Sequence, residues 1–174
     1  GFHDRRKTAL IVKGGPGTGK SVIAINLMSD LLSKGLNAHY ATGSKAFTET
    51  LRKVIGIRGS SQFKYFNSYA QAQSNEIDIM ICDEAHRIRK TSNSRFTPRV
   101  RQSNKAQIQE ILDASKVSVF FIDDKQVVRP DEIGSSVFIK EQATKNNCRI
   151  FEYELEAQFR CAGSDGFVNW IRLK

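Results

Sequence analysis

The chain has 174 residues, of which 40% are hydrophobic and 26% are charged, and its net charge is +9. This composition suits one globular domain with a substantial core, excludes fibrous and disordered chains, and is compatible with a polyanionic partner without requiring one. The longest apolar runs, such as residues 9–12 and 119–122, are far shorter than the ~20 residues that span a bilayer. Because the N-terminus also lacks the apolar segment of a secretory signal, we expect a cytoplasmic protein without a membrane span.

Predicted strands and helices alternate along the chain. Short apolar runs indicate strands, and apolar residues at helical spacing indicate helices. In chain order, we expect strand 8–13, helix 20–33, strand 38–41, helix 46–54, strands 63–66 and 77–82, helix 106–115, strand 117–122, helix 135–145, strand 149–155 and helix 165–172. Because several strands are apolar on both sides, they indicate a parallel sheet covered by helices. The predicted fold is α/β, a doubly wound and mostly parallel sheet with helices on both faces, in one domain over residues 1–174.

One side of the first predicted helix is apolar. Its apolar residues at helical spacing are Val22, Ile25, Met28 and Leu32. We therefore expect these side chains to form the face that the helix buries.

A glycine-rich segment links the first predicted strand to this helix. Its sequence, GGPGTGKS, fits the pattern G-x-x-x-x-G-K-[ST] and comprises Gly14, Gly15, Pro16, Gly17, Thr18, Gly19, Lys20 and Ser21. Glycines let successive backbone N–H groups point at phosphate oxygens, and the following helix adds the positive end of its dipole. We expect Lys20 to reach the β- and γ-phosphates and Ser21 to hold Mg²⁺. The flanking strand and helix make a turn without a ligand the less favoured interpretation.

An acidic pair follows the strand predicted at 77–82. An acid at this strand end, here Asp83, helps to hold magnesium in P-loop NTPases. The neighbouring Glu84 can orient or deprotonate the attacking water as a general base, and a nucleoside kinase would not need it, so the pair favours hydrolysis. His86 is equally compatible with a direct role and with a structural one.

The strand predicted at 117–122 also ends in polar residues, in the stretch FFIDDKQ. Ligands of doubly wound sheets lie beyond the carboxyl ends of the strands, so residues 123–126 should emerge beside the phosphates. An amide there can hydrogen-bond the γ-phosphate or the attacking water, a role we expect for Gln126. Without the glycine-rich segment, an ordinary polar cap on the strand would be preferred.

Residues 87–105 contain seven basic side chains and no acidic one. Most of this segment is predicted as one long loop, and long loops in compact domains tend to be functional or disordered. Contact with DNA or RNA, through Arg95, Arg99 and Arg101 for example, and a solvated surface segment are equally favoured.

Four motifs together resemble those of a known group of proteins. GGPGTGKS, DEAH, the D-x-x-Q of DDKQ and the later LEAQFRCAGSDGFVNW resemble, in that order, motifs I to IV of superfamily 1 helicases. More closely, the set resembles a bacterial family of ATPases and helicases related to the helicase-like domain of Schlafen proteins, over nearly the whole chain. The resemblance implies a RecA-like P-loop NTPase that uses ATP and Mg²⁺. It also implies that Gln126 senses the γ-phosphate, that Asp123 supports this motif, and that Arg160 contacts phosphate charge. A surface ion pair of Arg160 with Glu154 or Glu156 is the alternative.

The resemblance extends to contacts with nucleic acid. TGSKAF resembles motif Ia, which touches the nucleic-acid strand in superfamily 1, and YFNSYA resembles the segment after the third strand. Hydroxyl groups, a lysine and aromatic rings suit phosphate contact and base stacking, but they are also common at strand ends. The candidates are Thr42, Ser44, Lys45, Phe66 or Tyr69, and Asn67. Single-stranded DNA or RNA is the partner that this resemblance implies.

Three departures from the superfamily pattern bear on activity. Ile122 stands where glycine usually precedes the acids of motif III, and no glutamine lies before the P-loop to read adenine. Motifs V and VI, with the arginine of a second RecA-like domain, have no counterpart before Lys174. We therefore expect the first lobe of a larger helicase-like protein, with the second lobe in cis and slow hydrolysis by this lobe alone.

Three other classes of protein share part of this residue set. A self-contained ATP-dependent switch of the AAA or signalling type, acting on protein, normally places a lone polar sensor where DDKQ stands. A module that binds nucleotide without turnover conflicts with the intact set of Lys20, Ser21, Asp83 and Glu84. Superfamily 2 helicases also carry DEAH, but their third motif is typically Ser-Ala-Thr.

Overall fold

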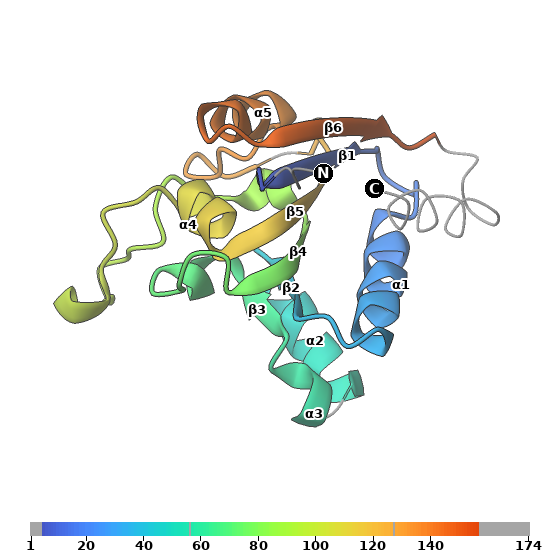
Figure 1. Ribbon diagram of the computed structural model, residues 1–174, viewed down its shortest axis with the longest axis horizontal. Helices are drawn as coiled ribbons and strands as arrows, with labels where there is room; N and C mark the ends of the chain where they lie inside the picture. Colours follow the sequence, from blue (N-terminus) through green and yellow to red (C-terminus); the bar gives the residue numbers. More distant parts are fainter. Residues whose placement is uncertain (1–4, 56, 127, 157–174) are drawn as a thin grey trace.

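Six parallel strands form one open sheet in the computed structural model, which describes residues 5–55, 57–126 and 128–156 (Figure 1). The strands are β1 (Thr8–Lys13), β2 (Ala38–Thr42), β3 (Phe63–Tyr65), β4 (Ile77–Asp83), β5 (Ser115–Ile122) and β6 (Arg149–Glu154). Their order across the sheet is β3-β2-β4-β5-β1-β6, and every pairing between them is parallel. Parallel pairing brings the carboxyl ends of β1, β2, β4 and β5 to one edge of the sheet.

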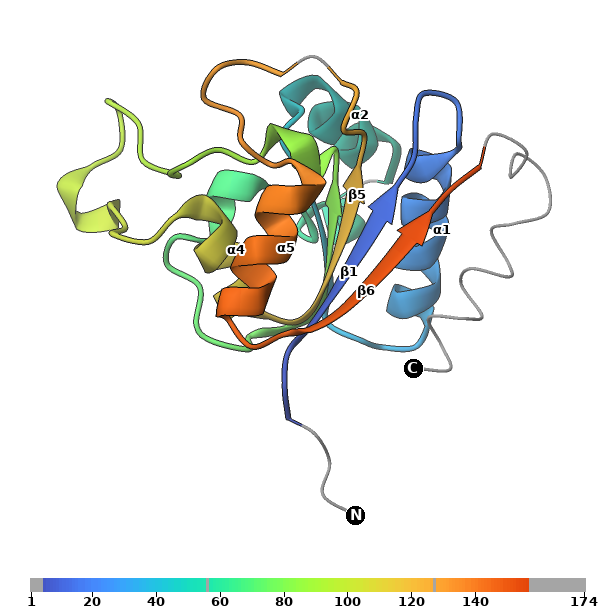
Figure 2. The same ribbon diagram turned by 90° about the horizontal axis from the view of Figure 1, so that it is seen from above.

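Helices cover both faces of this sheet, as Figure 2 shows. They are α1 (Lys20–Ser33), α2 (Lys45–Ile55), α3 (Ile57–Ser60), α4 (Gln107–Ala114) and α5 (Ser136–Lys145), with 3-10 turns η1 (Phe66–Tyr69), η2 (Ala85–Arg87) and η3 (Arg99–Arg101). Residues of α1 and α2 pack with one set of strand side chains, and residues of α4 and α5 pack with the opposite set. The predicted doubly wound α/β fold is therefore confirmed. None of the described helices is long and apolar enough to cross a membrane.

Most predicted elements are confirmed with end shifts of one or two residues. β1 and α1 have the expected bounds, and the helix predicted at 135–145 begins one residue later because Ser135 is its N-cap and accepts the Phe138 N–H at 3.2 Å. The strand predicted at 63–66 is shorter: Phe66 begins η1 instead. The short helix α3 was not predicted, and the helix predicted at 165–172 lies outside the described residues.

The buried face of α1 differs from the predicted one. Val22 and Leu32 are 61% and 37% exposed, so the expected stripe is wrong at both ends. The helix instead buries Ile23, Ala24, Leu27, Met28 and Leu31. Apolar residues lie on two adjacent sides of this helix. The spacing of apolar residues in the sequence does not tell which of these two sides is buried.

Candidate active site

The glycine-rich loop between β1 and α1 adopts backbone conformations and close contacts that only glycine readily accepts. Gly17 and Gly19 adopt left-handed conformations, with φ of 74° and 83°, which side chains other than glycine rarely accept. At Gly14 a Cβ would lie 2.6 Å from Thr18 Oγ1. The Gly14 N–H donates to the carbonyl of Ile122 at 3.0 Å, which ties the start of the loop to the end of β5. These contacts place the loop directly above the carboxyl edge of the sheet.

Lys20 lies inside this loop at the first position of α1. Its ammonium group donates to the carbonyl oxygens of Gly14 at 2.5 Å and Gly15 at 2.8 Å. Partial burial lowers the pKa of Lys20 from its usual value, while the charges of Asp123, Asp83 and Glu84 act in the opposite direction. The cation is therefore held by weak neutral acceptors that a phosphate oxygen can replace.

Asp83, at the end of β4, is the most heavily hydrogen-bonded acid of the site. Its side chain is buried; Oδ2 accepts from Ser21 Oγ at 2.9 Å and from the Tyr40 hydroxyl, and Oδ1 accepts from the Glu84 N–H at 2.9 Å. The hydroxyl of Ser21 and the carboxylate of Asp83 are thus brought together from α1 and β4, as the sequence predicts. Both are hard oxygen donors, and Mg²⁺ is usually held by one or two such groups together with substrate phosphates and water. This donor pair fits the ion.

Tyr40 is a residue of this site that the sequence reasoning missed. It lies on β2, where its side chain is buried, and burial together with the nearby charge of Asp83 raises the pKa of its hydroxyl far above the usual range. Tyr40 therefore stays protonated and donates to Asp83. A buried tyrosine usually needs a hydrogen-bond partner, which was a signal available in the sequence, but the partner follows only from the pairing of β2 with β4.

Glu84 directly follows β4 in a left-handed conformation, with φ of 51° and ψ of 45°. This geometry is uncommon for a residue other than glycine and often marks a functional site. Its carboxylate Oε2 lies 3.3 Å from Arg87 Nε, and both side chains are about one third exposed (37% and 35%). Burial is the main cause that raises the pKa of Glu84, while Arg87 opposes the shift. The turn at Glu84 aims its side chain away from the strand direction, beside the glycine-rich loop.

His86 connects the acidic pair to the polar end of β5. Its ring is buried; Nδ1 accepts the Asp123 N–H at 3.4 Å, whereas Nε2 has no hydrogen-bond partner among the described residues. Burial, followed by the charge of Arg87, lowers the pKa of His86, so the ring is neutral near pH 7. The contact with Asp123 supports the structural role, while the free nitrogen leaves a direct role open.

One cavity of about 310 Å³ brings together most of the residues predicted for the nucleotide site, but Gly14, Gly15 and Thr18 do not line it. It is lined by Pro16, Gly17, Gly19, Lys20, Ser21, Val22, Asp83, Glu84, His86, Asp123 and Gln126. Gln126 reaches it because Asp123 closes a tight turn: its carbonyl accepts the Gln126 N–H at 3.2 Å and its carboxylate accepts the Lys125 N–H at 3.0 Å. Ile122 is fully buried in the core, which explains an apolar side chain at that position. Arg160 lies outside the described residues.

Ile133 and Gly134 pack directly on η2 and the residue that follows it. Ile133 N–H donates to the Ile88 carbonyl at 2.7 Å, and a Cβ on Gly134 would lie only 1.9 Å from the Ala85 carbonyl oxygen. Glycine is needed at position 134 because the Ala85 carbonyl oxygen belongs to the backbone and cannot move aside as a flexible side chain could.

Gly134→Ala is therefore expected to lower the free energy of unfolding by about 1–3 kcal/mol, the usual cost of overpacking. Urea denaturation measures this change. Gly15→Ala is the matched control, because a Cβ there would meet nothing within 4 Å. Equal stability of the two variants would contradict the packing of Gly134 on η2.

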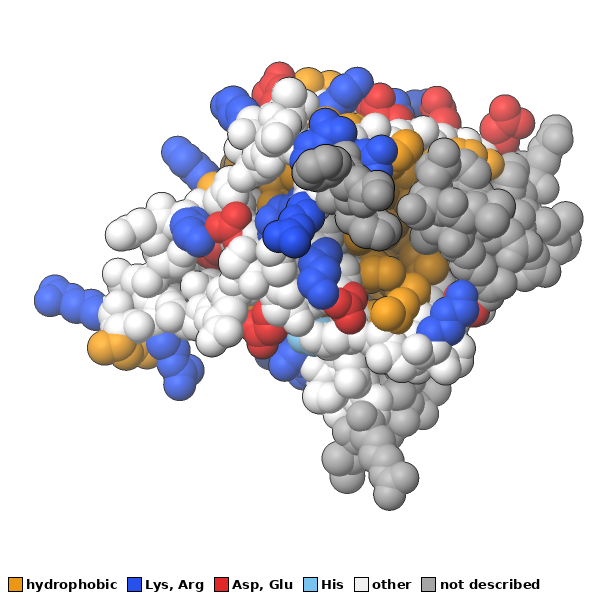
Figure 3. All heavy atoms as spheres, viewed as in Figure 1, with side chains coloured by type: hydrophobic (Ala, Val, Ile, Leu, Met, Phe, Trp, Pro, Cys, Tyr) orange, Lys and Arg blue, Asp and Glu red, His pale blue; other side chains and the backbone are white. Residues whose placement is uncertain are grey.

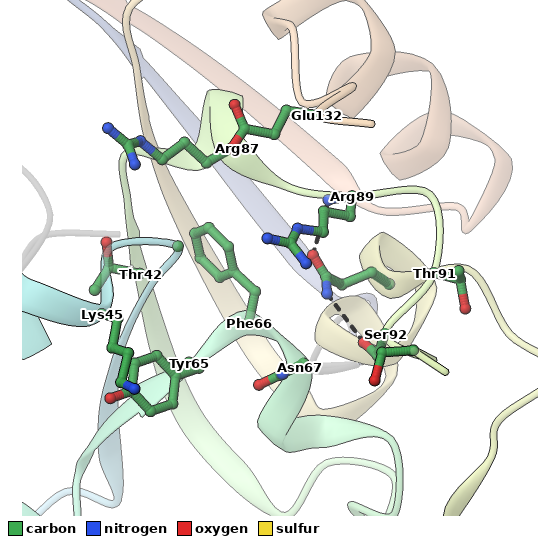
Figure 4. A pocket seen from close by; sticks show the side chains of 13 residues that line it. Thr42, Lys45, Tyr65, Phe66, Asn67, Arg87, Arg89, Thr91, Ser92 and Glu132 are labelled. Atoms are coloured by element: carbon green, nitrogen blue, oxygen red, sulfur yellow. Dashed lines mark hydrogen bonds between the residues drawn. The ribbon is translucent and has the colours of Figure 1, made fainter. Parts of the chain in front are cut away.

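Figure 4 shows a second cavity, of about 290 Å³. It is lined by Thr42, Gly43, Lys45, Tyr65, Phe66, Asn67, Arg87, Arg89, Thr91, Ser92, Ser94, Gln107 and Glu132. Four of the predicted nucleic-acid candidates, namely Thr42, Lys45, Phe66 and Asn67, thus come together here. Ser44 does not line this cavity: its hydroxyl accepts the Phe47 N–H at 3.3 Å at the start of α2. Arg87 and Arg89 were not among the candidates.

The aromatic candidates offer little surface for stacking. Phe66 and Tyr69 are only 3% and 4% exposed, because both rings belong to the core on one face of the sheet. The ring of Tyr65 is partly exposed, but the guanidinium group of Arg52 lies over it at 5.3 Å. Polar groups therefore dominate the accessible lining of this cavity.

The basic segment, residues 87–105, includes a loop that projects away from the sheet (Figure 1). Asn93 and Ser103 close its base with two hydrogen bonds, of 2.7 and 3.0 Å, and Gln107 holds the Arg89 N–H at 2.8 Å. Figure 3 shows basic side chains at its tip together with apolar ones. The exposed apolar residues there are Phe96 and Val100.

The structure divides the seven basic residues into two groups. Arg87, Arg89 and Lys105 form ion pairs with Glu84, Asp131 and Asp113, respectively. Of the three predicted contacts, Arg101 lines a further cavity beside Asn67, whereas Arg95 and Arg99 line neither that cavity nor the one around Phe66. The charge of the segment is therefore partly neutralised near the sheet and concentrated near its tip.

Glu110, on α4 beneath this loop, is a buried acid. Neither carboxylate oxygen has a hydrogen-bond partner among the described residues, although the hydroxyls of Ser92 and Ser103 are near. Burial raises the pKa of Glu110, and those hydroxyls offset the shift only in part. Since the native state then holds this proton more tightly than the unfolded chain, the contribution of Glu110 to stability is complete at low pH. It is lost as the pH rises from the unfolded value of about 4.3 through the raised folded value.

The variant Glu110→Gln is accordingly expected to be more stable than the wild type at neutral pH. It should lose this advantage near pH ~4, where the Glu110 carboxyl of the wild type is largely protonated and as neutral as the amide of the variant. Urea denaturation across this pH range is the measurement. Glu141→Gln, at an exposed position of α5, is the control and should show little difference at any pH. A variant less stable than the wild type at neutral pH would argue against a charge cost at Glu110.

Comparison with known structures gives weak similarities. They include APE1195 (TM-score 0.38, 11% identity, covering 98% of this chain and 73% of that one) and the flagellar accessory protein FlaH from Methanocaldococcus jannaschii (0.40, 14%, 83% and 71%). AMPPCP-bound DnaA from Aquifex aeolicus matches with a TM-score of 0.41 and 13% identity, over 97% of this chain and 47% of that one. Similarity at this level says nothing about ligand or function. No curated protein matched the sequence.

A family model matches almost the whole chain. It describes the DNA/RNA helicase domain of Schlafen group 3, and the match runs over residues 7–173. This range includes the glycine-rich loop, the acidic pair, Gln126 and Arg160. The chain therefore belongs to the Schlafen group 3 DNA/RNA helicase domain family.

Proposed function

We propose that this domain binds Mg-ATP and hydrolyses it as the ATPase lobe of a superfamily 1 DNA or RNA helicase or translocase. The observation that carries this proposal is the 2.9 Å hydrogen bond between Ser21 Oγ and Asp83 Oδ2, with Lys20, Glu84 and Gln126 lining the same cavity. A hydroxyl and a buried carboxylate at this distance, at the mouth of a glycine-rich loop, suit a magnesium–triphosphate better than a phosphate alone.

Binding follows from groups already in place. The N–H groups of Gly15, Gly17 and Gly19 and the N-terminus of α1 favour the phosphates, and Lys20 exchanges its carbonyl partners for the β- and γ-phosphate oxygens. Ser21 and Asp83 would hold Mg²⁺, which, when bound, neutralises charge that develops on the phosphates. Tyr40 fixes the orientation of the Asp83 carboxylate by donating to it.

Hydrolysis needs a positioned base and a sensor of the γ-phosphate. Glu84 is proposed as the general base that takes a proton from the attacking water, because its carboxylate adjoins the cavity without being bound to Ser21. Gln126, which lines the same cavity, is proposed to hydrogen-bond the γ-phosphate or that water, and Arg160 to stabilise transferring charge.

Nucleic acid is proposed to bind along the adjacent carboxyl ends of β2 and β3. The polar lining of the second cavity, with Thr42, Lys45, Asn67 and the arginines Arg87 and Arg89, suits phosphate and sugar contacts. The basic residues near the loop tip, including Arg95, Arg99 and Arg101, extend the positive surface to a longer strand. A second RecA-like lobe in cis would supply the movement that translocation needs, so this lobe alone is expected to hydrolyse ATP slowly.

The test of this function is the ATPase rate of the protein that contains the domain, measured at low salt with and without single-stranded DNA or RNA. We expect both to stimulate hydrolysis, and the stimulation to fall as salt rises. A measurable rate that is indifferent to both polymers would favour an ATP-dependent switch that acts on protein. Mg-ATP binding without any hydrolysis would favour a non-catalytic module.

A further inference from the structure

An ion pair joins the two neighbouring cavities. Glu84 lines the cavity of the glycine-rich loop, and Arg87 lines the cavity with Thr42, Lys45 and Phe66. Between them, Arg87 Nε lies 3.3 Å from Glu84 Oε2. The proposed base and a cation of the proposed nucleic-acid surface therefore restrain each other directly.

The position of Arg87 depends on a glycine of the β2–α2 turn. A Cβ on Gly43 would lie 2.8 Å from Arg87 Cβ and 3.3 Å from its Cδ. Gly43 has no positive φ, so its own backbone accepts alanine, but Arg87 Cβ is fixed to the main chain, and a Cβ on Gly43 would therefore shift Arg87 and the β2–α2 turn apart. This turn also carries Thr42 and Lys45, so the side chain of Arg87 packs against the surface that would meet a nucleic-acid strand. Figure 4 shows Arg87 beside Phe66 in this cavity.

The charges around the pair allow an exchange of partners. Besides Arg87, the groups whose charges act on Glu84 are Asp83, Glu132 and Lys20. The two members of the pair are about one third exposed, and ion pairs with such access to water are weak. A phosphate diester offers arginine a charged oxygen partner with charge-assisted hydrogen bonds, so it can compete with Glu84 for Arg87.

We propose that Arg87 is a positioning residue that restrains Glu84 until the phosphate backbone of a single-stranded nucleic acid draws the guanidinium group into the second cavity and leaves Glu84 free to face the attacking water. This inference rests on the proposed function, because it assigns the coupling between its two sites. Nucleic acid then stimulates hydrolysis by breaking the ion pair between Arg87 and Glu84. This change involves side chains only and requires no movement of the sheet.

The experiment compares ATPase rates of the full protein without polymer and with saturating poly(dT) or poly(U). Arg87→Gln is expected to raise the basal kcat by about 5-fold or more, the lower end of typical allosteric coupling, and to bring the ratio of stimulated to basal rate near one. Arg87→Lys keeps a cation and should retain most of the restraint and of the stimulation. Lys140→Gln, which breaks an exposed ion pair with Glu152 far from either cavity, is the charge-matched control and should behave as the wild type.

Gly43→Ala provides a second variant, which keeps the guanidinium group of Arg87. Because it shifts Arg87 relative to the β2–α2 turn, it should also raise the basal rate and reduce stimulation. A merely structural role of Arg87 would lower basal and stimulated rates together, and that result would overturn the proposal, as would full stimulation in Arg87→Gln. Absence of hydrolysis in the wild type under all conditions would instead reject the proposed function, and this inference with it.

Discussion

Lys20→Ala is expected to abolish the stabilisation of the protein by Mg-ATP. A ligand present at about 100 times its dissociation constant stabilises a folded protein by roughly 2.7 kcal/mol, and this gain disappears when the affinity falls well below the ligand concentration. Lys20 is the cation inside the glycine-rich loop, and its hydrogen-bond partners there are only carbonyl and hydroxyl oxygens. Without it, the loop still folds around its glycines but lacks the charge that binds the β- and γ-phosphates.

The measurement is the shift in melting temperature on addition of Mg-ATP. Because each shift is taken relative to the same variant without ligand, a change in the stability of the ligand-free protein does not affect the comparison. Lys34→Ala is the matched control, because Lys34 directly follows the other end of α1. Its ammonium group forms an ion pair with the partly exposed Asp30. The control should keep the full shift. An unchanged shift in Lys20→Ala would reject the assignment of the loop as a nucleotide site.

Glu84→Gln is expected to retain Mg-ATP binding and to lose about 10²- to 10⁴-fold in kcat, the usual contribution of a general base. The amide has the size of the carboxylate, so the left-handed turn after β4 is preserved, and Asp83 keeps its bonds to Ser21 and Tyr40. Only the capacity to accept a proton from water is lost.

Two measurements separate this effect from a loss of binding: the Mg-ATP thermal shift, which should match the wild type, and single-turnover hydrolysis, which should be slow. Glu141→Gln, the same change at an exposed position on α5, should leave both unchanged. A normal hydrolysis rate in Glu84→Gln would exclude Glu84 as the base, whereas loss of the thermal shift would indicate a role in binding.

Local sequence patterns were sufficient for most of the fold. β1 and α1 have their predicted bounds because an apolar run, a glycine-rich loop and apolar residues at helical spacing are all short-range signals. The grouping of Lys20, Asp83, Glu84 and Gln126 was also predictable, since polar residues at the carboxyl ends of parallel strands meet at one edge.

Features that depend on neighbours distant in the chain were predicted less well. The apolar residues of α1 allow two faces, and packing exposes Val22 while it buries Ile23. Phe66 continues the β pattern of its segment, yet the chain turns there because the ring enters the core. These outcomes depend on tertiary packing, which overrides local preference when the preference is small.

The glycine-rich loop and the acidic pair after β4 can be recognised from residues close together in the chain, because each motif carries its own backbone geometry and chemistry. The hydrogen bond from Tyr40 to Asp83, and the placement of Arg87 against Gly43 and between two cavities, depend on the pairing of β2 with β4. Strand register and turn packing join residues that are more than 40 positions apart, and no periodicity within a single segment encodes such a contact.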